Sequence, residues 1–230
     1  MIHSNAAVDV ALFMAILLPS IVLHEVAHGW VAERFGDSTA RDAGRITLNP
    51  ISHIDPVGTL IVPGMLAVAG QPVFGWAKPV PVNPGAFRRP KEHMAIVALA
   101  GPATNLLLGT GLAMAVRFDS ITAPTCTGLG FASNGLCLGA GQGVLAENLV
   151  DRMLLAAILV NVALAIFNML PIPPLDGSRL LPLVLPERAR IAYYRISQFG
   201  FLILFALIFM FRGAMSFISD WIGWIMRIFI

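Results

Sequence analysis

Residues 8–34 read VDVALFMAILLPSIVLHEVAHGWVAER, and this stretch decides the fold. Its apolar part, from Val8 to about Trp30, supplies the ~20 residues that an α-helix needs to cross a bilayer. Glu33 and Arg34 follow directly and mark the return to water. The stretch therefore predicts a first transmembrane helix, and with it a helical membrane protein.

The motif HEVAH occupies residues 24–28, near the end of this helix. His24 and His28 are four residues apart and share one helix face, so their imidazoles can bind a single Zn²⁺ beside Glu25 as a general base. At 1.5 Å per residue, His24 lies about 15 Å inside the boundary at Arg34. Ionisable groups at such depth are costly and point to function. The alternative is a polar patch that hydrogen-bonds to neighbouring helices.

The whole chain has the composition of a membrane protein. Of its 230 residues, 57% are hydrophobic and 12% are charged, and the mean hydropathy is +0.79. Soluble domains average about 25% charged residues. The composition predicts one domain over 1–230, with a core at about 8–180 and a fourth helix and tail at 196–230. It excludes a separate large soluble domain. The N-terminus lacks the features of a cleavable signal peptide.

The fold expected is an all-α polytopic membrane protein with about four transmembrane helices. Residues 58–70 are apolar but short, and Pro63-Gly64 interrupt them, so a membrane-dipping segment is expected there. Residues 213–230 can form an amphipathic interfacial helix or a fifth span. Short β elements are expected at Arg45–Leu48 and Val80–Val82. The three further spans are expected at 94–116, 149–170 and 196–211.

The distribution of Lys and Arg predicts the orientation. Both the 34–91 region and the 179–195 loop are basic, whereas the 117–148 loop has no Lys or Arg after Arg117. The positive-inside rule then places the basic regions in the cytoplasm and both termini outside. The protein is expected in the cell membrane, with its site towards the cytoplasm. Cys126 and Cys137 would face the oxidising side, where we hypothesise a disulfide.

A catalytic zinc needs a third protein ligand. Asp176 follows the third span on the side that carries HEVAH, in a segment that prolines keep from being helical. Asn168 precedes it and can donate to a developing oxyanion. The alternatives are a helix N-cap for Asp176 and a helix–helix hydrogen bond for Asn168. His53 or Asp55 can act as a regulatory fourth ligand or a rival third one, although a simple turn also explains them.

Other positions have expected roles in packing or access. Gly101, Asn105 and Gly109 fall on one face of the second span, where small residues let helices approach closely. Asn105 is also a candidate substrate or regulatory contact. Residues 76–83, with Trp76 and Val80, are expected to border the substrate cleft beside the dipping segment. The short strands can hold an unwound substrate by main-chain pairing.

Together these motifs resemble the site-2 protease family of intramembrane zinc metalloproteases. The likeness rests on HEVAH at 24–28, NMLPIPPLDG at 168–177 and GPATN at 101–105, and covers about residues 8–180. It implies a minimal family member, without a PDZ-like domain or a nucleotide-binding module. The protein would hold one Zn²⁺ per chain and cut a transmembrane segment of another protein in the lipid bilayer. No nucleic-acid partner is expected, and the oligomeric state stays open.

The resemblance also implies roles for single residues. His24, His28 and Asp176 would be the zinc ligands, Glu25 would take a proton from the attacking water, and Asn168 would contact the substrate or oxyanion. Two other classes compete with this interpretation. A metal-binding membrane transporter would need polar residues along most of a pore, whereas here they cluster near one face. An inactive scaffold that binds transmembrane helices would have no need of Glu25.

Overall fold

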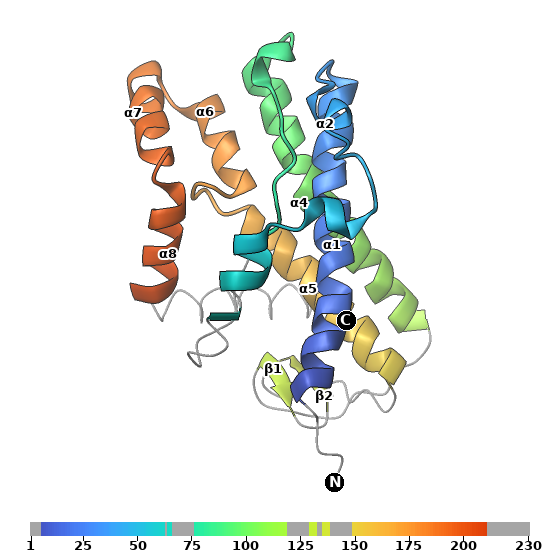
Figure 1. Ribbon diagram of the computed structural model, residues 1–230. Coiled ribbons are helices and arrows are strands. Elements are labelled where there is room, and N and C mark those ends of the chain that lie inside the picture. The colour runs from blue at the N-terminus through green and yellow to red at the C-terminus, as the bar shows by residue number, and fades with distance from the viewer. Residues whose placement is uncertain are drawn as a thin grey trace.

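The computed structural model describes residues 6–62, 64–65, 76–118, 129–132, 135–138 and 149–210. Its main helices run in alternating directions (Figure 1). They are α1 (Ala6–Arg34), α4 (Pro90–Phe118), α5 (Leu149–Asn168) and α8 (Gly200–Met210). The start of α1, the end of α4 and the start of α5 therefore lie at one end of the molecule, and α8 runs towards this end. The end of α1 and the starts of α4 and α7 lie at the other.

Short elements connect these helices. A single helical turn, α2 (Thr39–Asp42), follows α1, and α6 (Leu181–Val184) and α7 (Glu187–Ser197) lead into α8. Strands β1 (Leu129–Ala132) and β2 (Gly135–Leu138) form an antiparallel hairpin in the α4–α5 connection. The 3₁₀ turns are Pro50–His53, Pro84–Ala86 and Asp176–Leu180, and a π-helical turn covers Pro56–Ile61.

The centre of the fold is the packing of α4 against both α1 and α5. One buried cluster joins Ile16 of α1 to Ala156 and Val160 of α5. The predicted small-residue face of α4 explains the close approach: a Cβ on Gly109 would lie 3.0 Å from Cγ2 of Val162. Two of the three ligand candidates lie on α1 and the third follows α5, so this packing brings them together.

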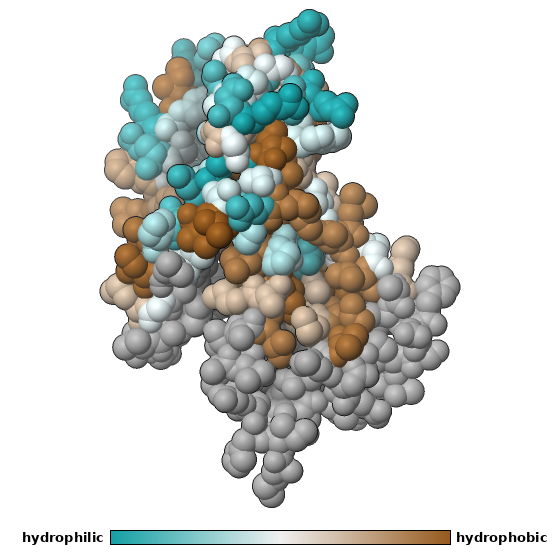
Figure 2. Space-filling model, turned by 45° about the vertical axis from the view of Figure 1, so that its right-hand side comes forward, coloured by the Kyte–Doolittle hydropathy of each residue, from teal (hydrophilic) through white to brown (hydrophobic). Residues whose placement is uncertain are grey.

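The surface of the molecule divides into a polar end and an apolar body. Hydrophilic residues gather at the end that carries α2, and hydrophobic residues cover the middle (Figure 2). Among the described residues, Leu12–Arg34 and Pro90–Met114 are long and apolar enough to cross a membrane, and Met153–Asn168 is a shorter apolar helix. Large side chains such as Leu107 are exposed on this body. The helical fold is confirmed, while the number of spans stays a prediction.

Several sequence predictions can be compared with these elements. Of the dipping segment, residues 58–62 and 64–65 are described, and they are helical. Arg45–Leu48 and Val80–Val82 are not strands. Residues 80–82 have no neighbouring strand to pair with among the described residues. Pro79 and Pro81 also have no backbone N–H to donate to such a strand. Cys126 and the 213–230 tail lie outside the described residues.

Residues 76–83 are held instead by side chains and isolated backbone contacts. The backbone N–H of Lys78 donates to the carbonyl of His53 at 2.9 Å. Buried Arg45 donates through Nη2 to the carbonyls of Lys78 (2.5 Å) and Pro79 (3.3 Å). The N–H of Asn83 donates to Oδ2 of Asp37 at 2.6 Å. The segment is thus fixed beside α1, near Glu25 and Gly29, without belonging to a sheet.

Asp37 is the anchor at the far end of this segment, and only 1% of its surface is exposed. Its carboxylate also accepts from the N–H (3.0 Å) and hydroxyl of Thr39. Burial alone would raise the pKa of Asp37, but the hydrogen bonds from Thr39 and Asn83 outweigh it and lower the pKa below its ordinary value. Since the folded state has the lower pKa, Asp37 stabilises the fold above pH 3.8, and this contribution is lost as the pH falls further.

We expect Asp37→Asn to lower the free energy of unfolding by about 1–3 kcal/mol at neutral pH, because an amide leaves a buried donor unpaired. The difference from wild type should shrink in acid, where the native carboxylate is protonated as well. Thermal unfolding of the metal-free protein in detergent micelles, from neutral pH down to about pH 3, measures both effects. Asp42→Asn is the matched control, because Asp42 is exposed. Equal stability of wild type and Asp37→Asn would contradict this role.

Candidate metal centre

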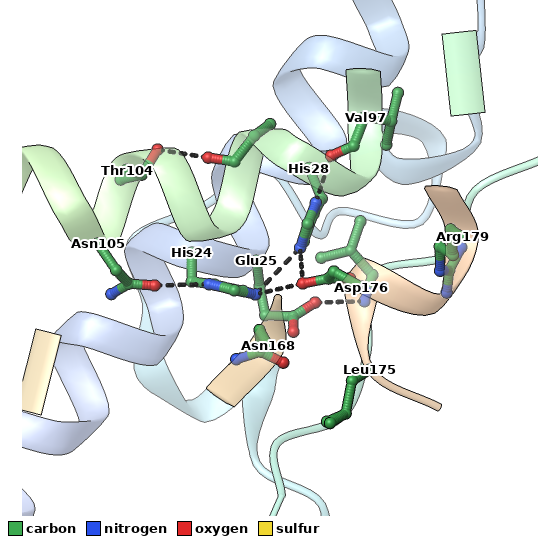
Figure 3. A network of polar contacts seen from close by, with 12 residues as sticks. His24, Glu25, His28, Val97, Thr104, Asn105, Asn168, Leu175, Asp176 and Arg179 are labelled. Carbon is green, nitrogen blue, oxygen red and sulfur yellow. Dashed lines mark hydrogen bonds and ion pairs between the residues drawn. The ribbon is translucent and has the colours of Figure 1, made fainter. Parts of the chain in front are cut away.

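Three potential ligand atoms converge between α1 and the segment that follows α5 (Figure 3). His24 Nε2 lies 3.0 Å from His28 Nε2. Oδ2 of Asp176 lies 3.0 Å from the first nitrogen and 3.1 Å from the second. Ligands about 2.0–2.1 Å from a tetrahedral zinc are separated by about 3.3 Å, so the observed triangle has nearly the size that zinc requires. In the described part of the chain, these three side chains form a cluster whose ligand atoms lie close enough together to hold one metal ion.

The Nδ1 atom of each imidazole has a hydrogen-bond partner on α4. His28 Nδ1 lies 2.7 Å from the carbonyl oxygen of Val97, which can only accept, so Nδ1 of His28 carries the proton. His24 Nδ1 lies 2.5 Å from Oδ1 of Asn105. Both rings then direct the lone pair of Nε2 towards Asp176. Two imidazole nitrogens and a carboxylate oxygen are a typical ligand set of a catalytic zinc, and the donor chemistry of the site fits the metal.

The turn after α5 fixes the position of Asp176. Prolines 171, 173 and 174 prevent the helix from continuing, and the Pro173–Pro174 peptide bond is cis. The backbone at Gly177 packs so closely that a Cβ would lie 2.1 Å from the carbonyl oxygen of Met169. The carbonyl of Ser178 accepts a hydrogen bond from the Tyr193 hydroxyl at 2.8 Å. The turn is therefore held by its own backbone and by α7.

Glu25 lies beside the three ligand atoms, at a cavity of about 120 Å³. Its Oε2 accepts a hydrogen bond from the backbone N–H of Val80 at 2.8 Å. Asn168 and Arg179 line the same cavity. Asn168 Nδ2 donates to the carbonyl of Leu164 at 3.0 Å, which uses one of the two amide hydrogens and leaves the second for a ligand.

Gly101 of α4 forms the wall behind the histidines. A Cβ at this position would lie 2.4 Å from Nε2 of His28 and 2.5 Å from Nε2 of His24. A methyl group there would occupy the space between the two nitrogens. The glycine keeps this space free of a side chain, a role beyond the helix packing that the sequence predicted.

The remaining predicted site residues serve other contacts. His53 is buried, and its Nε2 lies 2.9 Å from the carbonyl oxygen of Thr47. Asp55 caps the π-helical turn by accepting from the N–H groups of Val57 and Gly58. Neither belongs to the cluster of His24, His28 and Asp176 that can hold a metal ion in the described part of the chain. Trp76 packs against the dipping segment and α8.

Sequence reasoning missed three residues around the histidines. Ser20 and Asn161 are buried and continue the hydrogen bonding of Asn105. The sequence could have pointed to Asn161, because an asparagine within an apolar stretch of a membrane helix needs a hydrogen-bond partner. The Val97 carbonyl could not be found in this way, since every residue has one.

A helical membrane fold with two histidines, an aspartate and a neighbouring glutamate defines a membrane metalloprotease. The chain belongs to peptidase family M50, because the sequence model of this family matches residues 12–211. It is a zinc metalloendopeptidase, as this family and relatives named as zinc metalloproteases support. The predicted family, enzyme class and cofactor are therefore confirmed.

Two relatives are named as metalloproteases. "Putative zinc metalloprotease YwhC" of Bacillus subtilis (strain 168) is 36% identical over 193 residues, which are 83% of this chain and 77% of that protein. "Putative zinc metalloprotease Rip2" of Mycolicibacterium smegmatis is 32% identical over 200 residues, covering 83% of this chain and 64% of Rip2. The structure of a site-2 protease from Methanocaldococcus jannaschii aligns with 96% of this chain and 78% of that one, at 19% identity and a TM-score of 0.45.

We expect Gly101→Ala to abolish zinc binding, because the new methyl group would lie against both Nε2 atoms. Zinc per protein, measured by plasma mass spectrometry after purification in detergent, gives the answer. Gly111→Ala is the matched control on the same helix, since a Cβ added there would have nothing within 4 Å. Full zinc occupancy in Gly101→Ala would show that the metal lies elsewhere.

Proposed function

We propose that this protein is an intramembrane endopeptidase that cleaves a transmembrane segment of a membrane protein near the cytoplasmic face. The observation that carries the proposal is the convergence of His24, His28 and Asp176 beside Glu25 at one cavity, between helices with apolar exteriors. A soluble protease would have no need of this apolar exterior. A membrane-embedded substrate can reach such a site without leaving the lipid.

The three ligand residues would hold zinc, and Glu25 would serve as the base. When bound, zinc supplies Lewis-acid polarisation of the scissile carbonyl and of a water molecule. The Val80 N–H holds Oε2 of Glu25 in place, while Oε1 accepts no hydrogen bond from the described residues. The carboxylate is thus oriented with one oxygen available to take a proton from water. Asn168 lines the same cavity, and its second amide hydrogen can stabilise a developing oxyanion.

The orientation follows from charge. Lys and Arg are concentrated in the 34–91 and 179–195 regions. Hydrophilic residues gather at the end of the molecule that carries α2 (Figure 2), and we assign this end to the cytoplasm of the cell membrane. Both termini would then be extracytoplasmic, with four spans and a dipping segment between the first two. The substrate would be a single-pass or other transmembrane protein, which must unwind to expose its peptide bond. Nothing in this arrangement calls for a nucleic acid.

The transporter alternative finds less support. An ion path needs polar residues along most of the membrane thickness. The buried polar residues of the described helices are instead neighbours of the metal centre: Ser20, Asn105 and Asn161 form one hydrogen-bonded group with His24. The scaffold alternative leaves the oriented carboxylate of Glu25 without a purpose.

We expect Glu25→Gln to reduce peptide cleavage by roughly 10²–10⁴-fold, the range of general-base catalysis, while zinc stays bound. Glutamine can still accept the Val80 hydrogen bond, so the geometry should persist and only the proton acceptor is lost. Membrane proteomics of cells that express wild type or the variant would identify substrates as proteins with wild-type-specific ends inside a transmembrane segment. Cleavage of such a substrate in proteoliposomes then gives the rate. Undiminished turnover by Glu25→Gln would remove Glu25 from this role.

Access to the cavity is proposed to pass the dipping segment. Trp76 packs against it so tightly that a Cβ on Gly58 would lie 2.3 Å from the indole. The other side of the indole faces α8, with ring centroids 5.1 Å from Phe201 and 6.5 Å from Phe205. Figure 1 shows the dipping segment between α8 and α1. Trp76 therefore joins two elements between which a substrate helix would have to enter, and lids of this kind gate many enzymes.

We expect Trp76→Ala to weaken cleavage of a transmembrane substrate several-fold without loss of zinc, because the dipping segment loses its contact with α8. Cleavage rates in proteoliposomes and zinc content of the same samples measure the two effects separately. Trp30→Ala is the control, since Trp30 is exposed at the end of α1. Cysteine pairs between residues 76–83 and a trapped substrate should also crosslink. Unchanged cleavage together with absent crosslinks would make the segment a scaffold only.

A further inference from the structure

A chain of buried side-chain amides extends behind the metal centre and joins three helices. It begins at His24 of α1, whose Nδ1 lies 2.5 Å from Oδ1 of Asn105 on α4. Asn105 is fully buried, and its Nδ2 donates to Oδ1 of Asn161 on α5 (2.8 Å) and to the carbonyl of Ser20 on α1 (3.2 Å). Asn161 Nδ2 donates to Oγ of Ser20 at 3.0 Å and to the carbonyl of Ala157 at 2.9 Å.

The backbone carbonyls of Ile16, Ser20 and Ala157 determine the direction of every hydrogen bond in this chain of side chains. Ser20 Oγ donates to the carbonyl of Ile16 at 2.9 Å, so Oγ is left to accept from Asn161. Asn161 must turn its NH₂ group towards Oγ of Ser20 and the Ala157 carbonyl, since a carbonyl can only accept. Its Oδ1 is then the atom that faces Asn105.

Asn105 is constrained in the same way. Its NH₂ group faces two acceptors, the Ser20 carbonyl and Oδ1 of Asn161, and a reversed amide would place oxygen against oxygen at both contacts. Its Oδ1 is therefore the atom presented to His24, and an amide oxygen can only accept. Nδ1 of His24 must carry the proton, and Nε2 is left with its lone pair facing His28 and Asp176.

We infer that Asn105, oriented by Ser20 and Asn161, is a positioning residue that fixes His24 in the Nδ1–H tautomer required for a metal ligand. The inference deepens the proposed function, because it specifies what prepares one ligand of that same site. It also distinguishes the two histidines. The tautomer of His28 depends on a main-chain carbonyl at Val97, which no substitution removes, whereas that of His24 depends on one replaceable side chain.

The test compares Asn105→Leu with Asn105→Asp. Leucine removes the acceptor, so we expect affinity for Zn²⁺ or Co²⁺ to fall about 10–100-fold, as for other residues that orient a ligand. Aspartate restores an acceptor for Nδ1–H of His24 but sets a second oxygen against the Ser20 carbonyl. It should recover most of the metal affinity while the metal-free protein still melts at a lower temperature than wild type. Thr104→Val is the matched control, because the Thr104 hydroxyl bonds only within α4, to the carbonyl of Ala100.

A second readout reports the tautomer directly. Nitrogen-15 NMR of histidine-labelled, metal-free protein in micelles distinguishes Nδ1–H from Nε2–H, and the His24 signal is assigned by its loss in His24→Gln. Wild type, Thr104→Val and Asn105→Asp should show Nδ1–H at His24, and Asn105→Leu should gain Nε2–H. Neither measurement involves proteolysis, so the proposed function can fail while this inference holds, and the reverse.

Three results would overturn the inference: wild-type metal affinity in Asn105→Leu, equally weak binding by Asn105→Leu and Asn105→Asp, or a neutral His24 in the wild type that carries its proton on Nε2 and none on Nδ1. If Asn105→Leu does not fold, Asn161→Leu takes its place. That variant leaves Asn105 bonded to the Ser20 carbonyl, so the tautomer should persist and the metal affinity should fall less than about 10-fold. An Nε2–H tautomer in Asn161→Leu or Asn105→Asp would then be the contradictory result.

Discussion

The structure depends on one constraint: polar groups placed among apolar helices must find partners within the protein. Two histidines buried in lipid-facing sequence would each cost several kcal/mol if a ring nitrogen were left unpaired. The chain meets this constraint with a main-chain carbonyl for His28 and an asparagine for His24. The same bonds that remove the penalty also leave both Nε2 atoms directed at Asp176, so stability and metal binding have a common cause.

The constraint extends to the backbone, because ligands from distant parts of the chain can meet only where helices approach closely. Gly101 brings α4 against the imidazoles, Gly109 brings it against α5, and Gly177 folds the Asp176 turn back onto the end of α5. Each of these close contacts excludes a side chain for a different reason: the space for a metal, helix packing and a tight turn. Three glycines in different parts of the chain thus serve three structural purposes.

This explains how far sequence reasoning could go. HEVAH and LDG can be recognised from their local sequence, and the structure brings His24, His28 and Asp176 within reach of one another. The role of Asn105 depends on which face of α4 meets α1, and hydrophobic periodicity does not give that relation in membrane helices, because lipid and protein neighbours are equally apolar. Val80–Val82 has the composition of a strand, yet its main chain bonds to side chains, which β propensity does not describe.

The two halves of the site are consequently supported in different ways. The proposed ligands His24 and His28 are held by bonds within and between α1, α4 and α5, where helical backbone satisfies its own polar groups. The N–H that orients Glu25 belongs to residues 76–83, whose contacts are made through Arg45, Asp37 and the carbonyl of His53. Because the N–H of Val80 donates to Oε2 of Glu25, a displacement of residues 76–83 would change the position of this carboxylate first and those of His24, His28 and Asp176 only afterwards. The geometry thus couples residues 76–83 to Glu25, the proposed base, more directly than to His24, His28 and Asp176.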